Sequence, residues 1–327
     1  MAAHRLICYN QCQNQLKQVQ EIKAMTYVVC NLCGSNDYTV RFEQGVAQAN
    51  QIVNCKACGL MYANPRTKEV DSVLIETYDP EFVLSAIVNQ DSQRLEKEAL
   101  QVKDYEKTRA FIHQHYPEKG KLIEVGSGLG YLLNFFKQDG WNVLGLEPNV
   151  GMCRYAESEF GIEIIPTILE KAELEDRSAE AVLMMHVIEH VSDPYSTLKE
   201  VYRILKPGGI FVMETPRYDT LRFKLLGKRE RSLSCDGHIY FFTTNTLEKL
   251  ATKAGFTVLK RDYVGRSLTL DRVFYNLGVV SKSQVIKQIL KDMAVKLHLN
   301  KISLYLNTRD MERIYLKKPD SAQHNKT

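Results

Sequence analysis

The chain has 327 residues and a formal net charge of +4 at pH 7, so it has room for one large core and a small module and shows no charge bias toward a nucleic-acid partner. No stretch approaches the length of a membrane span, and no signal peptide is recognisable at the N-terminus. The eight cysteines therefore indicate reduced thiols or metal ligands rather than disulfides, and we expect a cytoplasmic protein.

Residues 25–65 have the pattern of a small metal-binding module, after a Gln- and Asn-rich extension (1–24) that we expect to be flexible. Two C-x-x-C-G knuckles supply four thiols: Cys30, Cys33, Cys55 and Cys58. Four thiolates suit tetrahedral Zn²⁺ without an open coordination position, which predicts a structural site. The alternative is buried cysteines that lie close together without a metal. Short strands at 38–42 and 51–54 complete a predicted zinc ribbon, whose metal would supply folding energy.

A helical linker is predicted for residues 66–118, with a break at Asp79-Pro80. Within it, residues 94–115 mix charged side chains with apolar ones, which is typical of an amphipathic helix. The simplest role for this segment is a connector that packs on the edge of a sheet.

The main domain, residues 119–318, begins with a buried strand at 122–125 that runs into a glycine-rich turn. The turn contains Gly126, Ser127, Gly128 and Gly130, and an apolar helix follows it. Glycine lets the backbone turn sharply and approach a ligand closely. A dinucleotide site would have its third glycine one residue later, where this chain has Tyr131. The alternative is an ordinary tight turn of an α/β protein.

A second apolar strand, 143–146, ends in Glu147 and Pro148. An acidic residue about 20 positions after such glycines can accept hydrogen bonds from both hydroxyls of a ribose. Glu147 therefore predicts a nucleoside-containing ligand.

The next strands place polar residues at the same edge of the predicted sheet. The fourth strand, 181–185, is followed by His186, and the fifth, 210–214, follows a helix and a Pro-Gly-Gly turn at 207–209. Because ligands of open α/β sheets bind beyond the carboxyl ends of the strands, His186 could meet a cofactor or an acceptor. Glu189 and His190 are predicted on the helix after His186, with capping or packing roles.

The loop after the fifth strand contains His238. Thr243 predicts the N-cap of a helix that ends at Gly255, and His238 would lie just before this ordered element. An imidazole titrates near neutrality, which suits a general base. The alternative is a structural histidine that is hydrogen-bonded to the backbone.

The C-terminal part is predicted to contain a sixth strand at 257–262, a basic amphipathic insertion at about 266–309, a closing strand at 311–317 and a flexible tail at 319–327. Five lysines of the insertion recur at helix-like intervals: Lys282, Lys287, Lys291, Lys296 and Lys301. They could form a solvated helical face, a lid over an anionic acceptor, or a surface for peripheral contact with anionic lipid.

Together, the glycine turn, the segment His186-Val187-Ile188-Glu189-His190-Val191 and the segment Arg203-Ile204-Leu205-Lys206-Pro207-Gly208-Gly209 resemble the small-molecule branch of class I S-adenosylmethionine-dependent methyltransferases. The resemblance implies a doubly wound, mostly parallel, seven-stranded Rossmann-like α/β sheet whose last strand is antiparallel. It implies leading helices that cover the cofactor pocket. The S-adenosylmethionine-binding residues would be Glu124, Gly126, Ser127, Gly128, Gly130, Glu147, Pro148 and His186.

The second knuckle with the residues up to Arg66 resembles the zinc-binding segment of sugar C-methyltransferases. The segment His238-Ile239-Tyr240-Phe241-Phe242-Thr243 resembles the "EH..YYS" stretch of the same enzymes, in which the histidine is the general base. The glutamate that precedes it there is Gly237 in this chain, so this position departs from the pattern of the C-methylating enzymes. The resemblance implies a catalytic role for His238, and its place after the fourth strand makes His186 the second catalytic candidate.

The expected reaction is O- or C-methylation of a sugar-like, polyketide-like or quinone-like small molecule. The alternative is an RNA or protein methyltransferase that uses the ribbon for recognition. The chain lacks the Asn/Asp-Pro-Pro-aromatic motif, a Pro-Cys nucleophile in the corresponding loops, and a cluster of arginines and aromatics on the ribbon. The sequence does not indicate an oligomeric state.

Overall fold

The computed structural model describes residues 25–48, 50–67, 99–235, 237–270, 297 and 302–320. The predicted extension at 1–24, the linker from 68 to 98, the five lysines of the insertion and the tail from 321 lie outside the described residues. None of the helices in the described part of the chain combines the length and apolar character needed to cross a membrane.

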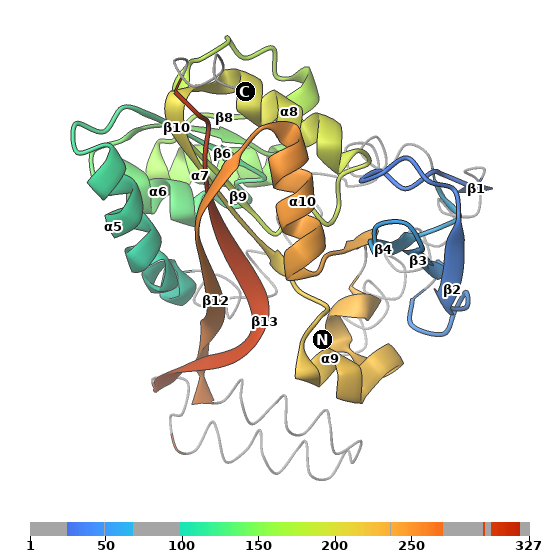
Figure 1. Cartoon of the computed structure of the whole chain (residues 1–327). Helices are drawn as coiled ribbons and strands as arrows, with labels where there is room; N and C mark the ends of the chain where they lie inside the picture. The colour runs from blue at the N-terminus through green and yellow to red at the C-terminus, as the bar shows by residue number, and fades with distance from the viewer. Residues whose placement is uncertain are drawn as a thin grey trace.

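A seven-stranded sheet forms the centre of the main domain, as predicted (Figure 1). Its strands, in spatial order, are β12 (Thr257–Thr269), β13 (Ser303–Lys317), β10 (Leu205–Pro216), β9 (Ala179–Met185), β6 (Lys121–Val125), β7 (Asn142–Leu146) and β8 (Ile164–Ile165). The five strands from β10 to β8 are parallel, and β13 is antiparallel to both of its neighbours. The order reverses between β6 and β9, where open α/β sheets bind ligands.

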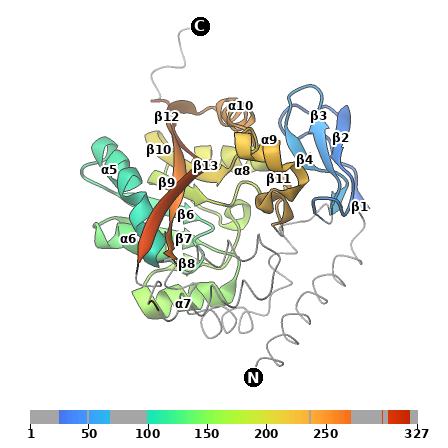
Figure 2. The same ribbon diagram turned by 90° about the horizontal axis from the view of Figure 1, so that it is seen from below.

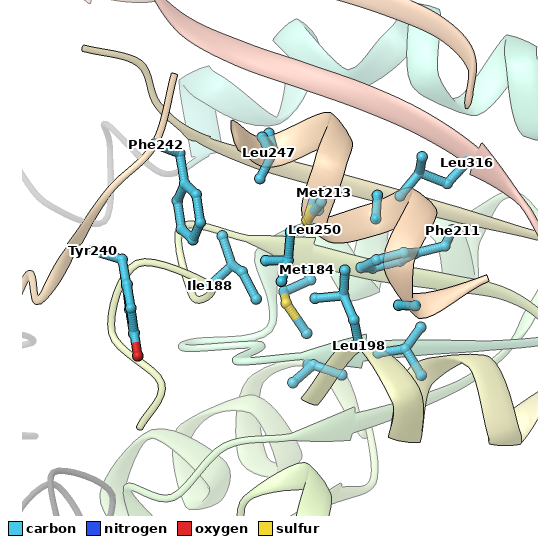
Figure 3. Close-up of a cluster of buried hydrophobic side chains, with 14 of the residues drawn as sticks. Met184, Ile188, Leu198, Phe211, Met213, Tyr240, Phe242, Leu247, Leu250 and Leu316 are labelled. Atoms are coloured by element: carbon cyan, nitrogen blue, oxygen red, sulfur yellow. The ribbon is translucent and has the colours of Figure 1, made fainter. Parts of the chain in front are cut away.

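Helices cover both faces of this sheet (Figures 1 and 2). They are α5 (Glu106–His115), α6 (Tyr131–Gln138), α7 (Val150–Phe160), α8 (Pro194–Ile204) and α10 (Thr244–Ala254). Successive residues of β9 face opposite sides, so that Leu183 packs with α6 whereas Met184 packs with α8 and α10. Figure 3 shows the second of these two cores, which contains Phe211, Leu247 and Leu250.

Helix ends follow from local side chains. Thr243 caps α10 through a capping box with Thr246, and Gly255 ends the helix in the left-handed conformation, as predicted. Asp193 caps α8 by accepting a hydrogen bond from the backbone of Ser196, and Pro194 is the first helical residue. The prediction that Glu189 and His190 lie on this helix was therefore wrong: they form the turn that precedes it.

The cysteine-containing segment forms a small sheet that includes a strand from the main domain. Its order is β11 (Tyr240–Phe241), β4 (Met61–Ala63), β3 (Ile52–Cys55) and β2 (Tyr38–Phe42). Tyr240 pairs with Tyr62, and Phe241 pairs with Met61. The ribbon lies on the opposite side of the molecule from α5 (Figures 1 and 2), and its apolar residues belong to the same core as α8 and α10.

Three boundary predictions were wrong. Residues 66–67 form a strand, β5 (Arg66–Thr67), which pairs with β1 (Met25–Thr26). The buried Arg66 guanidinium anchors this strand by donating to Ser192 O and Tyr240 Oη. The helix predicted for 94–115 is interrupted by a 3-10 turn, Val102–Tyr105. The insertion begins and ends as an antiparallel arm, because β12 and β13 remain paired as far as Thr269 and Ser303.

The predicted Pro-Gly-Gly turn lies inside β10, where the register shifts between Leu205 and Ile210. The remaining elements are short and lie in the connections: 3-10 turns at Leu169–Lys171, Gly227–Arg229 and Arg231–Ser234, and the helix α9 (Leu221–Leu226).

Candidate active site

The glycines after β6 differ in what their missing side chains allow. A Cβ on Gly126 (φ +72°) would lie 2.3 Å from Val187 Cγ2, and a Cβ on Gly130 (φ +79°) would lie 2.8 Å from Ala156 Cβ. Packing within the protein therefore excludes a side chain at both positions. At Gly128 (φ +53°), no atom of the described residues lies within 4 Å of a Cβ. Gly128 therefore presents an open backbone surface on which a ligand could lie.

Glu147 is held beside this turn at the tip of β7. Its Oε2 accepts a hydrogen bond from Gly128 N at 3.0 Å, and its Oε1 accepts one from Asn149 N at 2.9 Å. Each carboxylate oxygen has a second lone pair, so the group can still accept hydrogen bonds from ribose hydroxyls. Glu124 and Ser127, two other predicted cofactor residues, are buried.

An apolar cavity lies at the carboxyl ends of β6 and β7. Gly126 and Pro148 line it, as do Val125, Leu146, Ile168 and Val187. Mostly apolar walls with a few polar groups at the rim are typical of small-molecule sites. Of the predicted cofactor residues, Gly126 and Pro148 line this cavity. Glu147 directly precedes Pro148, and Gly128 lies two residues after Gly126.

His186 follows β9 and has a left-handed backbone (φ +58°). Its Nε2 lies 3.0 Å from Glu214 Oε1, and its Nδ1 lies 3.6 Å from Glu189 Oε1. Burial lowers the pKa of His186, but the neighbouring carboxylates of Glu189 and Glu214 outweigh this effect, and the pKa is raised. The His186 side chain is 32% exposed, so a ligand can contact it.

A buried ion pair orients Glu214. Arg313, its cross-strand neighbour on β13, is 2% exposed and donates from Nε to Glu214 Oε2 at 2.7 Å. Burial raises the pKa of Glu214, but the charge of Arg313 and the hydrogen bond with His186 outweigh it and hold the pKa at about 2. Neither residue was predicted as part of the site. The one available signal was an acidic residue at the end of an otherwise apolar strand.

Glu189 joins the two predicted catalytic histidines. It is 1% exposed, and its Oε2 accepts a hydrogen bond from Thr215 Oγ1 at 3.0 Å. His238 Nε2 lies 3.9 Å from the other carboxylate oxygen, Glu189 Oε1. Burial lowers the pKa of His238 to about 4, so its imidazole is neutral at pH 7. The structure thus brings His186 and His238 to one carboxylate.

Gly237 lies close to the histidines of this cluster. A Cβ at Gly237 (φ +82°) would lie 3.0 Å from His190 Nδ1, and the rings of His190 and His238 are 4.6 Å apart. A side chain at this position would therefore crowd His190 and would have to adopt a left-handed backbone that favours glycine.

The four knuckle cysteines converge as a zinc site requires. Their sulfur atoms all lie within 4.8 Å of one another, with Cys30 Sγ 3.4 Å from Cys58 Sγ and Cys33 Sγ 3.5 Å from Cys55 Sγ. Sulfurs about 2.3 Å from one tetrahedral Zn²⁺ would be about 3.8 Å apart. The donor set and its spacing fit Zn²⁺, and the site lies on the ribbon, away from the histidines.

Known proteins with similar sequences include methyltransferases. A tRNA U34 carboxymethyltransferase from Syntrophotalea carbinolica is 29% identical over 143 residues, which are 42% of this chain and 44% of that protein. A ubiquinone biosynthesis O-methyltransferase from Ruegeria pomeroyi is 33% identical over 100 residues, which are 29% of this chain and 40% of that protein. The matches thus span less than half the length of either relative.

A solved S-adenosylmethionine-dependent methyltransferase from Archaeoglobus fulgidus is 19% identical, with a TM-score of 0.47 over 73% of this chain and all of that one. A family model described as a methyltransferase domain matches residues 92–261, just over half of the chain. With this match and a sheet that carries the glycine turn, an acidic strand tip and an antiparallel last strand, the chain belongs to the methyltransferase-domain family.

Proposed function

We propose that the chain transfers a methyl group from S-adenosylmethionine to a small-molecule acceptor with a sugar-like, polyketide-like or quinone-like oxygen or carbon nucleophile. The observation that supports it best is the adjacency of two half-sites. The open face of Gly128 and the Glu147 carboxylate suit a nucleoside. Val187 lines the apolar cavity beside them, and it directly follows His186 of the polar cluster.

In this proposal the glycine turn and the β7 tip bind the cofactor. Gly126 and Gly128 let the backbone approach it, Glu147 accepts the ribose hydroxyls, and Pro148 and the apolar cavity walls contact the base. Glu124, Ser127 and Gly130 support the turn from the protein side, because Glu124 and Ser127 are buried and Gly130 packs on Ala156.

Methyl transfer is an in-line displacement. The acceptor atom forms a bond to the methyl carbon while the sulfur–carbon bond breaks, its electron pair stays on sulfur, and the acceptor proton must leave. His186 is the better placed of the two histidines to contact the acceptor, since its side chain is 32% exposed and that of His238 is 7% exposed. Because Glu189 and Glu214 stabilise its protonated form, it would orient the acceptor as a hydrogen-bond donor rather than take its proton. The role of His238 as a base stays a prediction from the sequence.

An RNA acceptor is the second candidate. It is favoured by the relatives that are tRNA U34 carboxymethyltransferases. A screen should therefore contain bulk tRNA beside nucleotide sugars and phenolic acceptors, with radioactive methyl transfer as the readout.

The binding half of the proposal can be tested by calorimetry before any acceptor is known. Glu147→Ala should weaken S-adenosylmethionine binding by about 1.5–3 kcal/mol, the range for hydrogen bonds to a charged group, while the exposed Glu159→Gln on α7 should not. With a genuine acceptor, His186→Ala should lower turnover by about 10²–10³-fold, the range for the loss of one positioned hydrogen-bond donor. Equal cofactor affinity in the wild type and Glu147→Ala would contradict the proposed cofactor site.

We also propose that the four knuckle cysteines bind one structural Zn²⁺, in a cytoplasmic environment that keeps the thiols reduced. Four thiolates complete the tetrahedron, so no position remains open for catalysis.

A further inference from the structure

We propose that Glu189, His190 and His238 form a second metal site, one that binds a divalent cation at the carboxyl ends of β9 and β10. A carboxylate oxygen of Glu189 and one ring nitrogen from each histidine all lie within 4.8 Å of one another. Ligand atoms about 2.0–2.2 Å from one cation are at most roughly 4.4 Å apart. Small side-chain rotations would therefore close the set around an ion.

One buried oxygen of the cluster is aimed into this space without a hydrogen bond. Within the described residues, Glu189 Oε1 has no hydrogen-bond partner, and the nearest ring nitrogens are His186 Nδ1 at 3.6 Å and His238 Nε2 at 3.9 Å. A carboxylate that is 1% exposed is costly to bury unless a positive charge or hydrogen bonds compensate it. His186 gives part of that compensation from 3.6 Å, and a cation between Glu189, His190 and His238 would add to it.

The backbone holds these ligands in place. The carbonyl oxygen of Glu189 accepts hydrogen bonds from Ile239 N at 2.9 Å and Tyr240 N at 3.1 Å, which ties the His238 loop to the Glu189 turn. Thr215 fixes the other carboxylate oxygen. These contacts leave Glu189 Oε1 directed at the two histidines, as a preorganised site requires.

The donor set indicates the class of cation. Two imidazoles and one carboxylate suit Zn²⁺, Co²⁺ or Mn²⁺, whereas Mg²⁺ and Ca²⁺ prefer sites made of oxygen. Three protein ligands leave coordination positions open, and His190 itself lines the apolar cavity. An acceptor oxygen could therefore bind the cation. This role rests on the proposed methyl transfer, whereas cation binding does not.

With His238 as a ligand, its lone pair would not be available for proton transfer. The cation would lower the pKa of a bound acceptor hydroxyl, so that its proton could leave to a water molecule while His186 donates a hydrogen bond to the acceptor. The inference thus gives the two predicted catalytic histidines different tasks.

The test is a titration of the zinc-loaded protein with Mn²⁺ alone, followed by the EPR signal of free Mn²⁺ and by calorimetry. We expect one equivalent of Mn²⁺ to bind in addition to the ribbon zinc. His190→Ala, His238→Ala and the isosteric Glu189→Gln should each weaken binding at least tenfold. His113→Ala, which removes an exposed histidine of α5, is the matched control and should bind Mn²⁺ like the wild type. A parallel Co²⁺ titration should give absorption bands without thiolate charge transfer.

Trp141 fluorescence during a urea titration will show which variants are folded, and Glu189→Gln keeps the site interpretable if a histidine variant is not. Stoichiometric Mn²⁺ binding that is lost in these variants but not in His113→Ala supports the site, even if no acceptor is ever methylated. Two results would overturn it: no Mn²⁺ or Co²⁺ bound beyond the zinc equivalent, or equal binding in the wild type and all three ligand variants.

Discussion

Replacing Arg313 with methionine should destabilise the main domain more than any surface substitution. The guanidinium is 2% exposed and donates to Glu214 Oε2, to Thr108 Oγ1 at 2.8 Å and to Asp104 O at 3.1 Å. Methionine has a similar length but no donors, so Glu214 would remain buried without its countercharge. Breaking a buried pair in this way costs about 3–5 kcal/mol.

The free energy of unfolding can be measured by urea titration, with the fluorescence of Trp141 as the reporter. It is the one tryptophan of the chain, and it is buried in the core between α6 and the sheet. Arg109→Met is the matched control, because Arg109 pairs with Glu106 and Asp139 at the surface and should cost at most about 1 kcal/mol. The double variant with Glu214→Gln should be more stable than the sum of the two single effects predicts. A loss below about 1 kcal/mol in Arg313→Met, or strict additivity, would refute the account of this pair.

Two further predictions concern the glycine turn and the zinc. Gly128→Ala should lower S-adenosylmethionine affinity at least tenfold, because its Cβ would enter the ligand space. Gly161→Ala is the control for backbone strain: Gly161 also has a positive φ (+58°), in the left-handed region, and its Cβ would meet only Lys137 Nζ at 3.6 Å, so the substitution costs roughly 1–2 kcal/mol of strain away from the ligand. Equal affinities in these two variants would mean that no ligand lies on Gly128. Purified protein should contain one tightly bound zinc, and Cys58→Ser should lose it, as measured by metal analysis under reducing conditions. A wild-type zinc content in Cys58→Ser would contradict the four-thiolate site.

Features that depend on near neighbours in the chain could be predicted from the sequence. The strand before Gly126, the cap at Thr243 and the cysteine knuckles are local patterns, and each lies where it was expected. The helix assigned to Glu189 and His190 was wrong because the apolar spacing continues through the turn, while Pro194 sets the actual start.

Contacts between distant segments could not be predicted. From its charge, Arg313 would be expected on the surface of the last strand. Its burial is explained by its pairing with Glu214, which is far away in the sequence. Likewise, nothing in residues 237–242 indicates that Tyr240 and Phe241 form a strand with Met61 and Tyr62. Such pairings depend on the register of the whole sheet rather than on local propensity.

The strand β11 determines how far the chain can be shortened. A chain that began after Ala63 would lack β4, and the backbone N–H and C=O groups of Tyr240 and Phe241 would lose their partners. Their rings, now 1% and 0% exposed, would face solvent next to an open strand edge, which is a common starting point for aggregation. The ribbon is therefore better regarded as the cover of this edge than as a detachable accessory, and exchanging it between relatives would require exchanging β11 with it.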